Sequence, residues 1–565
     1  MPDMYILGLS RGHNSSVCLL KNGEVIFYIE EERISRLKHD GTPFRALEEV
    51  KKYTNRIDAV AIAHTDNNVP RSDWCSKNIY VEFLRKHHLI TYDTPVHLMG
   101  GAHHKLHAAC AFYNSGFDDA VAIIVDGAGT YMETQNLLGV PITLWEAETI
   151  FDCSYPGMFE TLYQNLQTNY ATPRQMIQTA NSPNSESWLS DNPGIVKCYE
   201  AVTCYLGFDP IEAGKTMGLS PYGEDDNRIP RFFNGVGSSN RNLVTPTIPS
   251  ASVINVSNFS FLADSTLENQ KNLAYRVQID SQEAVLSLIQ KAVEISGKKN
   301  IVIAGGYGLN CVANYWYLDK IPGNINLYVE PISHDGGTAI GAAKLIHYHM
   351  FQNDVKHPQK SIYYGTAHNI DTAYVRSLED FESEEVSYAD VARLIKDQNI
   401  VCLYQGRSEA GPRALGNRSI LFDPSVPNGK DIVNEVKRRE WFRPFAGSVL
   451  LEKAHEWFDL KTLDESPFMM YAVNVRDDKI GQIPSVTHVD GTCRVQTVTE
   501  SQNRHYYNLI SEFEKLSGIP LLFNTSFNLA GDPLVETIDD AINTLRKSDL
   551  KYLYFPEVAL LLRKK

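Results

Sequence analysis

Two histidines spaced four residues apart are the first side chains in this sequence with an evident chemical use. His103 and His107 lie in the stretch Gly101–Tyr113, where alanines and histidines recur on the faces of an expected helix. This spacing places both imidazoles on one helix face, about one turn apart, where they can chelate a metal ion. The alternative is a polar helix with two unrelated histidines, and the pair alone does not decide between the two.

Two aspartates strengthen the metal interpretation. Asp126 follows the apolar run Ala120–Val125 and opens a glycine turn, and Asp335 has the same place after Ile325–Val329. A carboxylate at a strand end is aimed at a cleft, although aspartates there also simply form turns. Two histidines and two aspartates make a hard-to-borderline donor set, open to water or phosphate oxygens. The candidate metal ligands are therefore His103, His107, Asp126 and Asp335.

A second candidate site lies late in the chain, where basic residues gather although the chain is acidic overall. Seven of them fall within 37 residues, namely Arg407, Arg413, Arg418, Lys437, Arg438, Arg439 and Arg443. Several sit in turns, as in Gly411-Pro412-Arg413 and Arg443-Pro444-Phe445. Because arginine forks bind phosphate oxygens through paired hydrogen bonds, we expect an anion site for a phosphate and a nucleotide. A solvated charged face is the alternative.

Two polar loops are further candidate ligand sites, and a third segment that resembles a phosphate-binding loop is excluded. Asn524–Asn528 follows an apolar run and offers hydroxyls, amides and backbone N–H groups at a strand end. Gly305–Asn310 lets the backbone approach a ligand at a helix start, where amide groups favour anions, although simple turn geometry needs glycine too. Gly214-Lys215-Thr216 is not a P-loop, because Asp209 stands where that motif requires glycine.

The elements that must position these residues predict α/β architecture in two parts. A β-meander is expected at the start, and a similar unit begins at Ala120–Val125, which hints at a duplicated body. Further helices or strands are expected at Gln282–Ser296, Ile301–Ala304, Ile325–Val329, Ala339–His347, Asp390–Lys396 and Ile400–Tyr404. Residues 160–260 are rich in Asn, Ser, Pro and Thr and are expected to be irregular or inserted. The boundary between the two parts is expected between about 350 and 390.

Bulk properties exclude several classes of protein. The chain has 565 residues and a net charge of −15, which argues against broad nucleic-acid binding. Its nine cysteines are scattered without a CxxC pair, which predicts free thiols in a reducing compartment. No leader-like segment opens the chain, and no stretch approaches the roughly 18 apolar residues of a membrane span. A cytoplasmic protein is therefore expected.

Taken together, these motifs resemble the O-carbamoyltransferases that include the nodulation-factor and tobramycin carbamoyltransferases. The resemblance covers nearly the whole chain, and the joint order of its motifs is highly specific. The matching stretches are His13–Ser16, Glu30–Asp40, His103–Ala109, Val125–Gly127, Glu212–Leu219, Gly305–Asn310, Asp335–Ala343, Gly411–Gly416, Lys437–Ala446 and Asn524–Asn528.

The resemblance implies a fold and a reaction. Residues 1–358 would form a duplicated, actin-like domain that holds a metal, similar to the tRNA threonylcarbamoyl-transferase subunit. Residues 359–388 would be a linker, and 389–565 a YrdC-like twisted-sheet domain. Carbamoyl phosphate and ATP, with Mg²⁺, would give carbamoyl adenylate and pyrophosphate in the second domain. The carbamoyl group would then pass to a hydroxyl of a small-molecule natural product in the first, where the implied metal is Fe(II).

The resemblance also assigns residues. Its metal ligands map onto the two histidines and two aspartates named above. His13 is the acceptor-side histidine, counted as catalytic with Asp126, and Lys38 is the acceptor-binding residue. Nucleotide or adenylate contacts are Lys215, Gly305, Gly306 and Asn310. Carbamoyl-phosphate and ATP contacts are Arg413, Arg418, Lys437, Arg443, Arg494, Ser526 and Asn528.

The acceptor cannot be identified from the sequence. The acidic balance leans toward a cationic acceptor, such as an aminoglycoside or a guanidinium alkaloid. Two other functions stay open: tRNA threonylcarbamoyl transfer, which the net charge and the fused synthase-like module disfavour, and a non-catalytic, sugar-kinase-like nucleotide-binding scaffold. A homodimer is left open, and no membrane association is expected.

Overall fold

The computed structural model divides the chain into two compact units. It describes residues 3–65, 78–135, 139, 141–168, 170–179, 182–235, 238–248, 251–351 and 355–565. The first unit comprises Met1–Glu31 and Asp40–Gln359, and the second comprises Glu32–His39 and Lys360–Lys565. The expected break near residue 359 is thus present, while the excursion at Glu32–His39 has no counterpart in the sequence-based expectations.

The first sheet of the first unit has the strand order β3-β2-β1-β4-β5. Its strands are β1 (Tyr5–Ser10), β2 (Ser16–Lys21), β3 (Glu24–Glu30), β4 (Ala59–Ala63) and β5 (Val96–Leu98). Strand β1 pairs antiparallel with β2 and parallel with β4. Almost every residue of β1 and β2 is buried, as expected for central strands covered on both faces.

The second sheet repeats this topology. Along β9-β8-β6-β14-β15, strand β6 pairs antiparallel with β8 and parallel with β14. Its strands are β6 (Asp119–Val125), β7 (Tyr131–Gln135), β8 (Pro141–Ser154), β9 (Met158–Thr168), β10 (Gln175–Thr179), β11 (Ser182–Ser190), β14 (Asn300–Ala304) and β15 (Asn326–Val329). The shared order and strand directions confirm the duplicated α/β architecture expected from the sequence.

Residues 160–260 are more regular than their composition suggests. They contain most of β9, all of β10 and β11, helices α6 (Ile195–Tyr205) and α7 (Ala213–Leu219), and a hairpin of β12 (Val244–Ile248) and β13 (Ala251–Ile254). The expectation of irregular structure there was wrong. Polar residues are compatible with strands near a sheet edge, where one face meets solvent, so composition is a poor guide.

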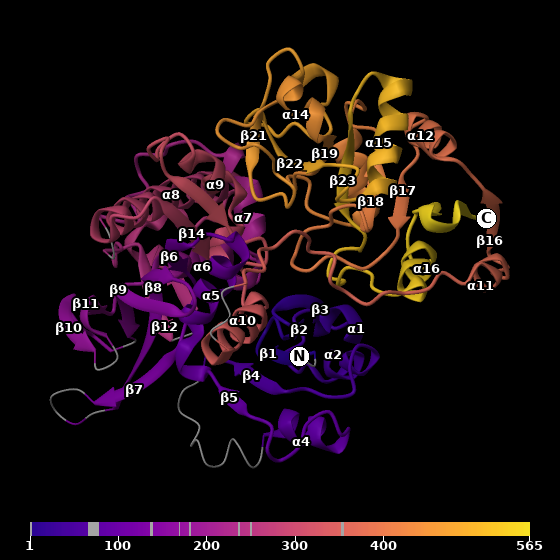
Figure 1. The fold of residues 1–565 in the computed structure, drawn as a ribbon. Helices are drawn as coiled ribbons and strands as arrows, with labels where there is room; N and C mark the ends of the chain where they lie inside the picture. Colours follow the sequence, from indigo (N-terminus) through magenta and orange to yellow (C-terminus); the bar gives the residue numbers. More distant parts are fainter. Residues whose placement is uncertain are drawn as a thin grey trace. The chain divides into compact units, whose positions relative to one another are not determined.

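Helices α5 (His103–Ser115) and α10 (Gly337–Phe351) bring the two sheets of this unit together (Figure 1). Helix α10 packs on β1, helix α5 packs on β6 and β14, and the two helices contact each other. A Cβ on Gly341 of α10 would lie 1.9 Å from the carbonyl oxygen of Leu106 in α5. Likewise, a Cβ on Gly8 of β1 would lie 2.0 Å from the carbonyl oxygen of Ala339. Glycine at these positions permits backbone contact without an intervening side chain.

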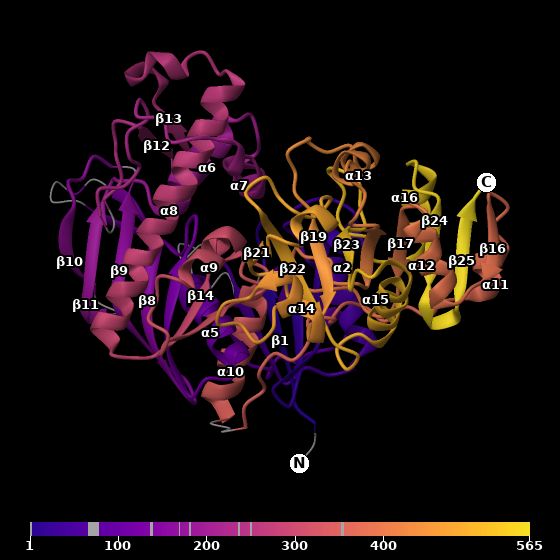
Figure 2. The same ribbon diagram turned by 90° about the horizontal axis from the view of Figure 1, so that it is seen from above.

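The remaining helices of the first unit surround these layers. The long helix α8 lies against β6 and α6 (Figure 2). The helices are α2 (Phe44–Glu49), α4 (Ile79–Lys86), α8 (Leu267–Ser296) and α9 (Cys311–Tyr317). Helix α8 begins at Leu267, fifteen residues before the expected Gln282, and the side chain of the preceding Thr266 caps it.

The second unit is built on one mixed sheet with the order β16-β25-β24-β17-β18-β23-β19-β22-β21-β20. Helices α12 and α15 lie side by side against it (Figure 1). The strands are β16 (Phe381–Glu385), β17 (Val401–Tyr404), β18 (Arg418–Phe422), β19 (Ala446–Leu450), β20 (Phe458–Asp459), β21 (Ala472–Val475), β22 (Thr492–Val498), β23 (Leu521–Ser526), β24 (Tyr552–Phe555) and β25 (Leu560–Lys564). The helices are α11 (Thr372–Arg376), α12 (Tyr388–Lys396), α13 (Gly429–Lys437), α14 (Leu451–Trp457), α15 (Arg504–Ser517) and α16 (Ile538–Arg546). The stretch 359–388, expected to be a linker, contains α11 and the edge strand β16, which pairs with β25.

The segment Glu32–His39, hereafter the strap, fastens two loops of the second unit. It includes most of helix α1 (Glu31–Ser35). Arg33 donates hydrogen bonds to the carbonyl oxygens of Glu409 (3.3 Å) and Gly411 (2.6 Å). Arg36 donates to the carbonyl oxygens of Leu534 and Pro533 at 2.6 and 2.8 Å. Charged donors make strong bonds to such carbonyls, so the strap is an integral part of this unit.

No described helix combines the length and apolar character needed to cross a membrane. The described cysteines are all free thiols, as expected from their spacing. Cys75 lies outside the described residues.

We expect Gly341→Ala to lower the free energy of unfolding by about 1–3 kcal/mol, because the added methyl group would collide with the Leu106 carbonyl. Chemical denaturation provides the measurement. Gly214→Ala is the matched control, since Gly214 is also helical and its Cβ would meet no atom within 4 Å. That control should be neutral or stabilising by up to about 1 kcal/mol. Equal stability of the two variants would contradict the close-contact interpretation.

Candidate functional site

Four side chains from three parts of the first unit converge at the N-terminal end of α5. His103 and His107 come from α5, Asp126 follows β6, and Asp335 lies two residues before α10. The Nε2 atoms of the two histidines are 3.2 Å apart. His103 Nε2 lies 3.4 Å from Asp126 Oδ2 and 3.5 Å from Asp335 Oδ1, and His107 Nε2 lies 3.6 Å from that Asp335 oxygen. The sequence-based grouping of these four residues is thus reproduced in space.

This arrangement fits a divalent cation. Metal–ligand bonds of about 2.0–2.1 Å in a tetrahedron place neighbouring ligand atoms roughly 3.4 Å apart. All four donor atoms here lie within 4.8 Å of one another, and the closest pairs match that spacing. Imidazole nitrogen and carboxylate oxygen suit several transition metals, so the donor set does not select one of them.

Hydrogen bonds from neighbouring groups orient the ligands. The backbone N–H of Gly306 donates to Asp126 Oδ1 at 2.9 Å, which leaves Oδ2 facing the histidines. The backbone N–H of His103 donates to Thr130 Oγ1 at 3.1 Å. Such outer contacts commonly fix the direction of metal ligands.

The charges of the cluster depend strongly on one another. Burial by itself would lower the pKa of His103, but the charges of Asp335 and Asp126 outweigh it and raise that pKa to about 10. The positive histidines in turn lower the pKa values of Asp126 and Asp335, against the opposing effect of burial. Protons and a cation therefore compete for the same four side chains.

His13 lies beside this cluster. Its Nδ1 is 3.6 Å from Asp335 Oδ2, the oxygen that does not face the metal-binding histidines. The imidazole is 48% exposed, in contrast to the buried rings of His103 and His107. Asp335 therefore links an accessible imidazole to the metal-ligand set.

The expected nucleotide contacts of the first unit do not share one environment. Gly305 and Gly306 lie at the cluster. Gly305 has a positive φ of 88°, and a Cβ there would lie 2.4 Å from the Val125 carbonyl oxygen, so both its conformation and its surroundings favour glycine. Asn310 caps helix α9 and exchanges hydrogen bonds with Gln278. Lys215 pairs with Glu212 at 2.8 Å. Asn310 and Lys215 are thus engaged in contacts with neighbouring residues of the protein itself.

A basic cluster in the second unit comprises Lys437, Arg439, Arg443 and Arg494. Lys437 is 1% exposed, and its ammonium donates to the carbonyl oxygen of Ser526 and, at 3.2 Å, to Asn528 Oδ1. Burial lowers its pKa, and the charges of Arg439 and Arg443 lower it further. The pKa of Arg439 is likewise lowered by burial and by Arg443 and Arg494. Clustered cations whose charges oppose one another favour a bound anion.

Comparisons with known proteins identify the family to which the chain belongs. Residues 51–344 match the carbamoyltransferase N-terminus family model, and residues 392–562 match the carbamoyltransferase C-terminus model. An uncharacterized protein of Synechocystis sp. is 30% identical over 98% of this chain and 96% of its own length. The chain belongs to the carbamoyltransferase family.

Other relatives of this carbamoyltransferase have names from nodulation. Nodulation protein NolNO of Sinorhizobium fredii is 30% identical over 95% of this chain and 77% of its own length. Nodulation protein U of Rhizobium tropici is 26% identical over 94% of this chain and 91% of its own. Among solved structures, HypF of T. kodakarensis is 13% identical over 62% of this chain and 49% of its own, with a TM-score of 0.37.

Arg439 of this carbamoyltransferase belongs to the basic cluster; the sequence grouped it with the expected anion site, but the family resemblance assigned it no contact. Arg438 ends helix α13 in the left-handed conformation, with φ of 56°, and its guanidinium donates to the carbonyl oxygen of Lys547. The next residue, Arg439, is half-buried beside Thr525, whose hydroxyl oxygen accepts a hydrogen bond from its guanidinium at 3.4 Å. The sequence alone does not indicate which of these two adjacent arginines faces the cluster.

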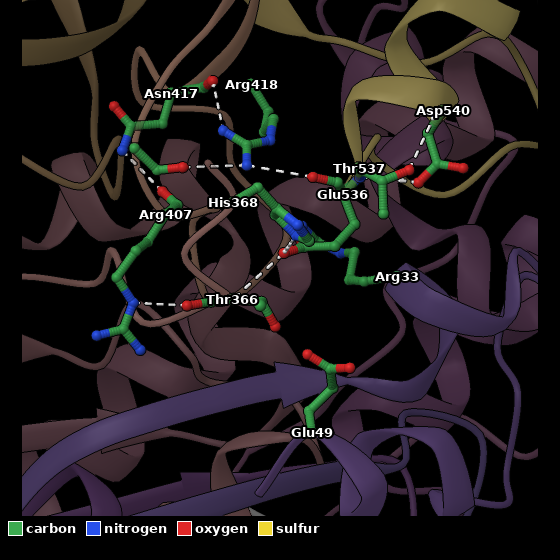
Figure 3. A network of polar contacts seen from close by, with 12 residues as sticks. Arg33, Glu49, Thr366, His368, Arg407, Asn417, Arg418, Glu536, Thr537 and Asp540 are labelled. Atoms are coloured by element: carbon green, nitrogen blue, oxygen red, sulfur yellow. Dashed lines mark hydrogen bonds and ion pairs between the residues drawn. The ribbon is translucent and has the colours of Figure 1, made fainter. Parts of the chain in front are cut away.

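Arg418 is structural in its contacts. Its side chain is fully buried, and Figure 3 shows it between Asn417 and Glu536, with hydrogen bonds to both backbone carbonyls. Further bonds go to the carbonyls of Gln405 and Gly406. A guanidinium engaged in this way has little capacity left for a phosphate. Arg418 is therefore not counted with the basic cluster, and its role in phosphate binding stays an expectation.

Lys38 lies in the strap, where its ammonium is 3.2 Å from Glu32 Oε1. The other carboxylate oxygen of Glu32 accepts the backbone N–H of His39 at 2.9 Å. Lys38 therefore belongs to the second unit, whereas His13 belongs to the first. A role of Lys38 in acceptor binding stays an expectation.

We expect His107→Ala to weaken divalent-metal binding by more than about 100-fold, because it removes one of four donors. The metal content after dialysis and a Co²⁺ titration measure this effect independently of activity. His104→Gln is the matched control, since it alters a histidine of the same helix that bonds Thr149 instead. A His107→Ala protein that retains one tightly bound cation would contradict the assignment.

We expect inorganic phosphate to bind the second unit with uptake of protons. Without an anion the pKa of Lys437 is depressed, and a bound phosphate stabilises the charged ammonium and raises that pKa. At a pH between the pKa of Lys437 without phosphate and its pKa with phosphate bound, binding therefore protonates the amine. Calorimetric titrations at about pH 7–9 in buffers of different ionisation enthalpy measure the uptake. Lys437→Met should abolish this proton uptake. Proton uptake of the same size in that variant would show that another group takes up the proton.

Proposed function

We propose that this carbamoyltransferase is an ATP-dependent O-carbamoyltransferase. Carbamoyl adenylate would form at the basic cluster of the second unit, and the carbamoyl group would pass to a hydroxyl at the histidine–aspartate cluster of the first. One observation carries the proposal: the second unit contains a cluster of cations that lower one another's pKa, and the first unit contains a histidine–aspartate cluster beside an accessible imidazole. A one-site reaction would not require both.

The first half-reaction joins the carbamoyl group to AMP. Carbamoyl phosphate and one water give carbamate and inorganic phosphate, and carbamate then attacks the α-phosphorus of ATP. A new phosphorus–oxygen bond forms, and pyrophosphate leaves with the bonding electron pair. Lys437, Arg443 and Arg494 would hold phosphate oxygens and offset developing negative charge, as fixed cations do effectively in buried sites. Ser526 and Asn528 would complete the contacts, and Mg²⁺ would accompany ATP.

The second half-reaction transfers the carbamoyl group. The acceptor hydroxyl oxygen attacks the carbamoyl carbon, the bond from that carbon to the phosphate oxygen breaks, and AMP leaves. His13 takes the hydroxyl proton. Because its Nδ1 faces Asp335, the neutral imidazole would keep its proton there and use Nε2 as the base. The negative charge of Asp335 then stabilises the imidazolium that forms.

A divalent cation fits the first unit and would add to this chemistry. His103, His107, Asp126 and Asp335 would hold it, with Fe(II) as the metal that the family resemblance suggests, and it would act as a Lewis acid. The acceptor would be a small-molecule natural product, and the net charge of −15 favours a cationic one.

We expect two variants to separate the half-reactions. Arg443→Ala should slow carbamoyl-phosphate-dependent pyrophosphate release about 30- to 1000-fold, because a charged phosphate contact is lost. His13→Asn should leave that release intact and slow transfer about 100- to 10,000-fold, so that carbamoyl adenylate accumulates. Pyrophosphate release and quenched carbamoyl adenylate are measured side by side.

The matched control is Arg438→Ala, since Arg438 neighbours the basic cluster but bonds the Lys547 carbonyl. It should release pyrophosphate at nearly the wild-type rate. Formation of ADP in place of AMP would identify a kinase-like reaction and refute the proposal. Adenylate formation from threonine and bicarbonate, but not from carbamoyl phosphate, would identify threonylcarbamoyl transfer instead.

A further inference from the structure

A half-buried histidine in the loop before strand β22 joins the two backbone segments that carry Arg443 and Arg494. The Nε2 atom of this residue, His488, lies 2.9 Å from the carbonyl oxygen of Phe445, two residues after Arg443. Its Nδ1 atom lies 3.1 Å from the hydroxyl oxygen of Thr492, two residues before Arg494. The imidazole thus bonds both segments, although it has no part in the chemistry described so far.

The position of the Phe445 backbone affects most of the basic cluster. The guanidinium carbon of Arg439 lies 5.1 Å from the centre of the Phe445 ring, a distance typical of a cation–π contact. Ala446, the next residue, pairs with Arg494 across the parallel strands β19 and β22. Arg443 lies on the other side of Phe445 in the same segment. Three of the four cations therefore depend on where this piece of backbone lies.

The loop that carries His488 is fixed by its own hydrogen bonds. The backbone N–H of His488 donates to the carbonyl oxygen of Thr492 at 2.7 Å. Asp490 Oδ1 accepts the backbone N–H of Thr492 at 3.0 Å and its hydroxyl at 2.7 Å. Such side-chain bonds to nearby backbone stabilise tight turns. The backbone N–H of Val475 in β21 also donates to the Gly491 carbonyl, which ties the loop to the sheet. The imidazole is therefore attached to a firm support.

The hydrogen-bond partners of the ring identify which nitrogen holds the Phe445 segment. A carbonyl oxygen can only accept, so Nε2 carries a hydrogen and donates it to Phe445. Burial lowers the pKa of His488 more than Asp490 and the Phe445 carbonyl raise it, and Arg494 and Lys430 lower it further, so the ring is neutral at neutral pH. Nδ1 then has a lone pair that faces the neighbouring hydroxyl.

We propose that His488 is a positioning residue of the basic cluster, which fixes the Phe445 backbone through Nε2 and thereby holds Arg439 and Arg443 at the spacing from Arg494 that a phosphate group requires. The inference rests on the proposed function, in which this cluster binds phosphate oxygens. Arginines bind phosphate through paired, directional hydrogen bonds, so a displaced guanidinium loses contacts that its charge alone does not replace.

The experiment compares variants of the full-length protein that preserve one ring nitrogen or neither. In His488→Gln the amide nitrogen reaches the place of Nε2, in His488→Asn it reaches only that of Nδ1, and His488→Phe keeps a ring without nitrogen. Calorimetry gives the Kd of inorganic phosphate, and pyrophosphate release gives kcat and the KM of carbamoyl phosphate. Thermal unfolding reports on the fold.

His488→Phe and His488→Asn should raise the Kd of phosphate and the KM of carbamoyl phosphate about 10- to 100-fold, as expected for groups displaced by about 1 Å. His488→Gln should bind phosphate nearly as tightly as the wild-type protein. A histidine needed only for folding would behave differently, because a smaller folded fraction lowers the apparent kcat and leaves Kd and KM unchanged. The comparison of His488→Asn with His488→Gln decides the matter even where His488→Phe does not fold.

His505→Phe is the matched control for His488→Phe. His505 is also a half-buried histidine of the second unit, and its Nδ1 lies 2.6 Å from the Tyr388 hydroxyl oxygen. This variant should leave Kd and KM unchanged. Thr492→Val removes the hydroxyl that faces Nδ1 but leaves the bond from Nε2 to Phe445, so it should raise Kd less than His488→Asn does.

Wild-type affinity for phosphate in His488→Asn would overturn the inference, and so would an equal loss of affinity in His488→Gln and His488→Asn. In both cases the wild-type protein binds phosphate and releases pyrophosphate, so the proposed function stands. A wild-type protein that neither binds phosphate nor releases pyrophosphate from ATP with carbamoyl phosphate would refute the proposed function, and this inference with it.

Discussion

The close contact between helices α5 and α10 determines where the chemistry of the first unit lies. Gly341 brings the two backbones together, and Gly8 brings α10 equally close to β1. Because α5 rests on one sheet and α10 on the other, the contact joins the duplicated halves at a single place. The histidines of α5 and the aspartate before α10 meet there, and Asp126 arrives from the central strand of the second sheet. The metal-ligand set is thus assembled by packing rather than by one continuous motif.

The two units handle charge in opposite ways. In the first, two aspartates and two histidines offset one another, so the cluster can exchange protons for a cation. In the second, the cations of the basic cluster disfavour one another's charge, which a phosphate would relieve. The net charge of −15 is a property of the whole chain, and it does not reveal these two opposite local charge distributions.

The sequence predicted the features that depend on local patterns. The spacing of His103 and His107, and an aspartate after each of two apolar strands, were sufficient to predict that these four side chains lie together. Features that depend on distant contacts were not predictable. The full burial of Arg418 is set by carbonyls from several separate loops, and the strand character of residues 160–190 is set by pairing at a sheet edge.

The strap has a consequence for how the chain is made. In the second unit, Arg33 and Arg36 bond the loops around Gly411 and Leu534. The two arginines are synthesised early in translation and the two loops late. The hydrogen bonds of the strap to these loops therefore cannot form until more than 300 intervening residues of the first unit have been synthesised. A chain that started at Lys360 would lack four arginine–carbonyl hydrogen bonds and would have to hold those loops without them. The covalent chain crosses the boundary between the units three times. A single cut in the sequence therefore cannot separate the two units without dividing one of them.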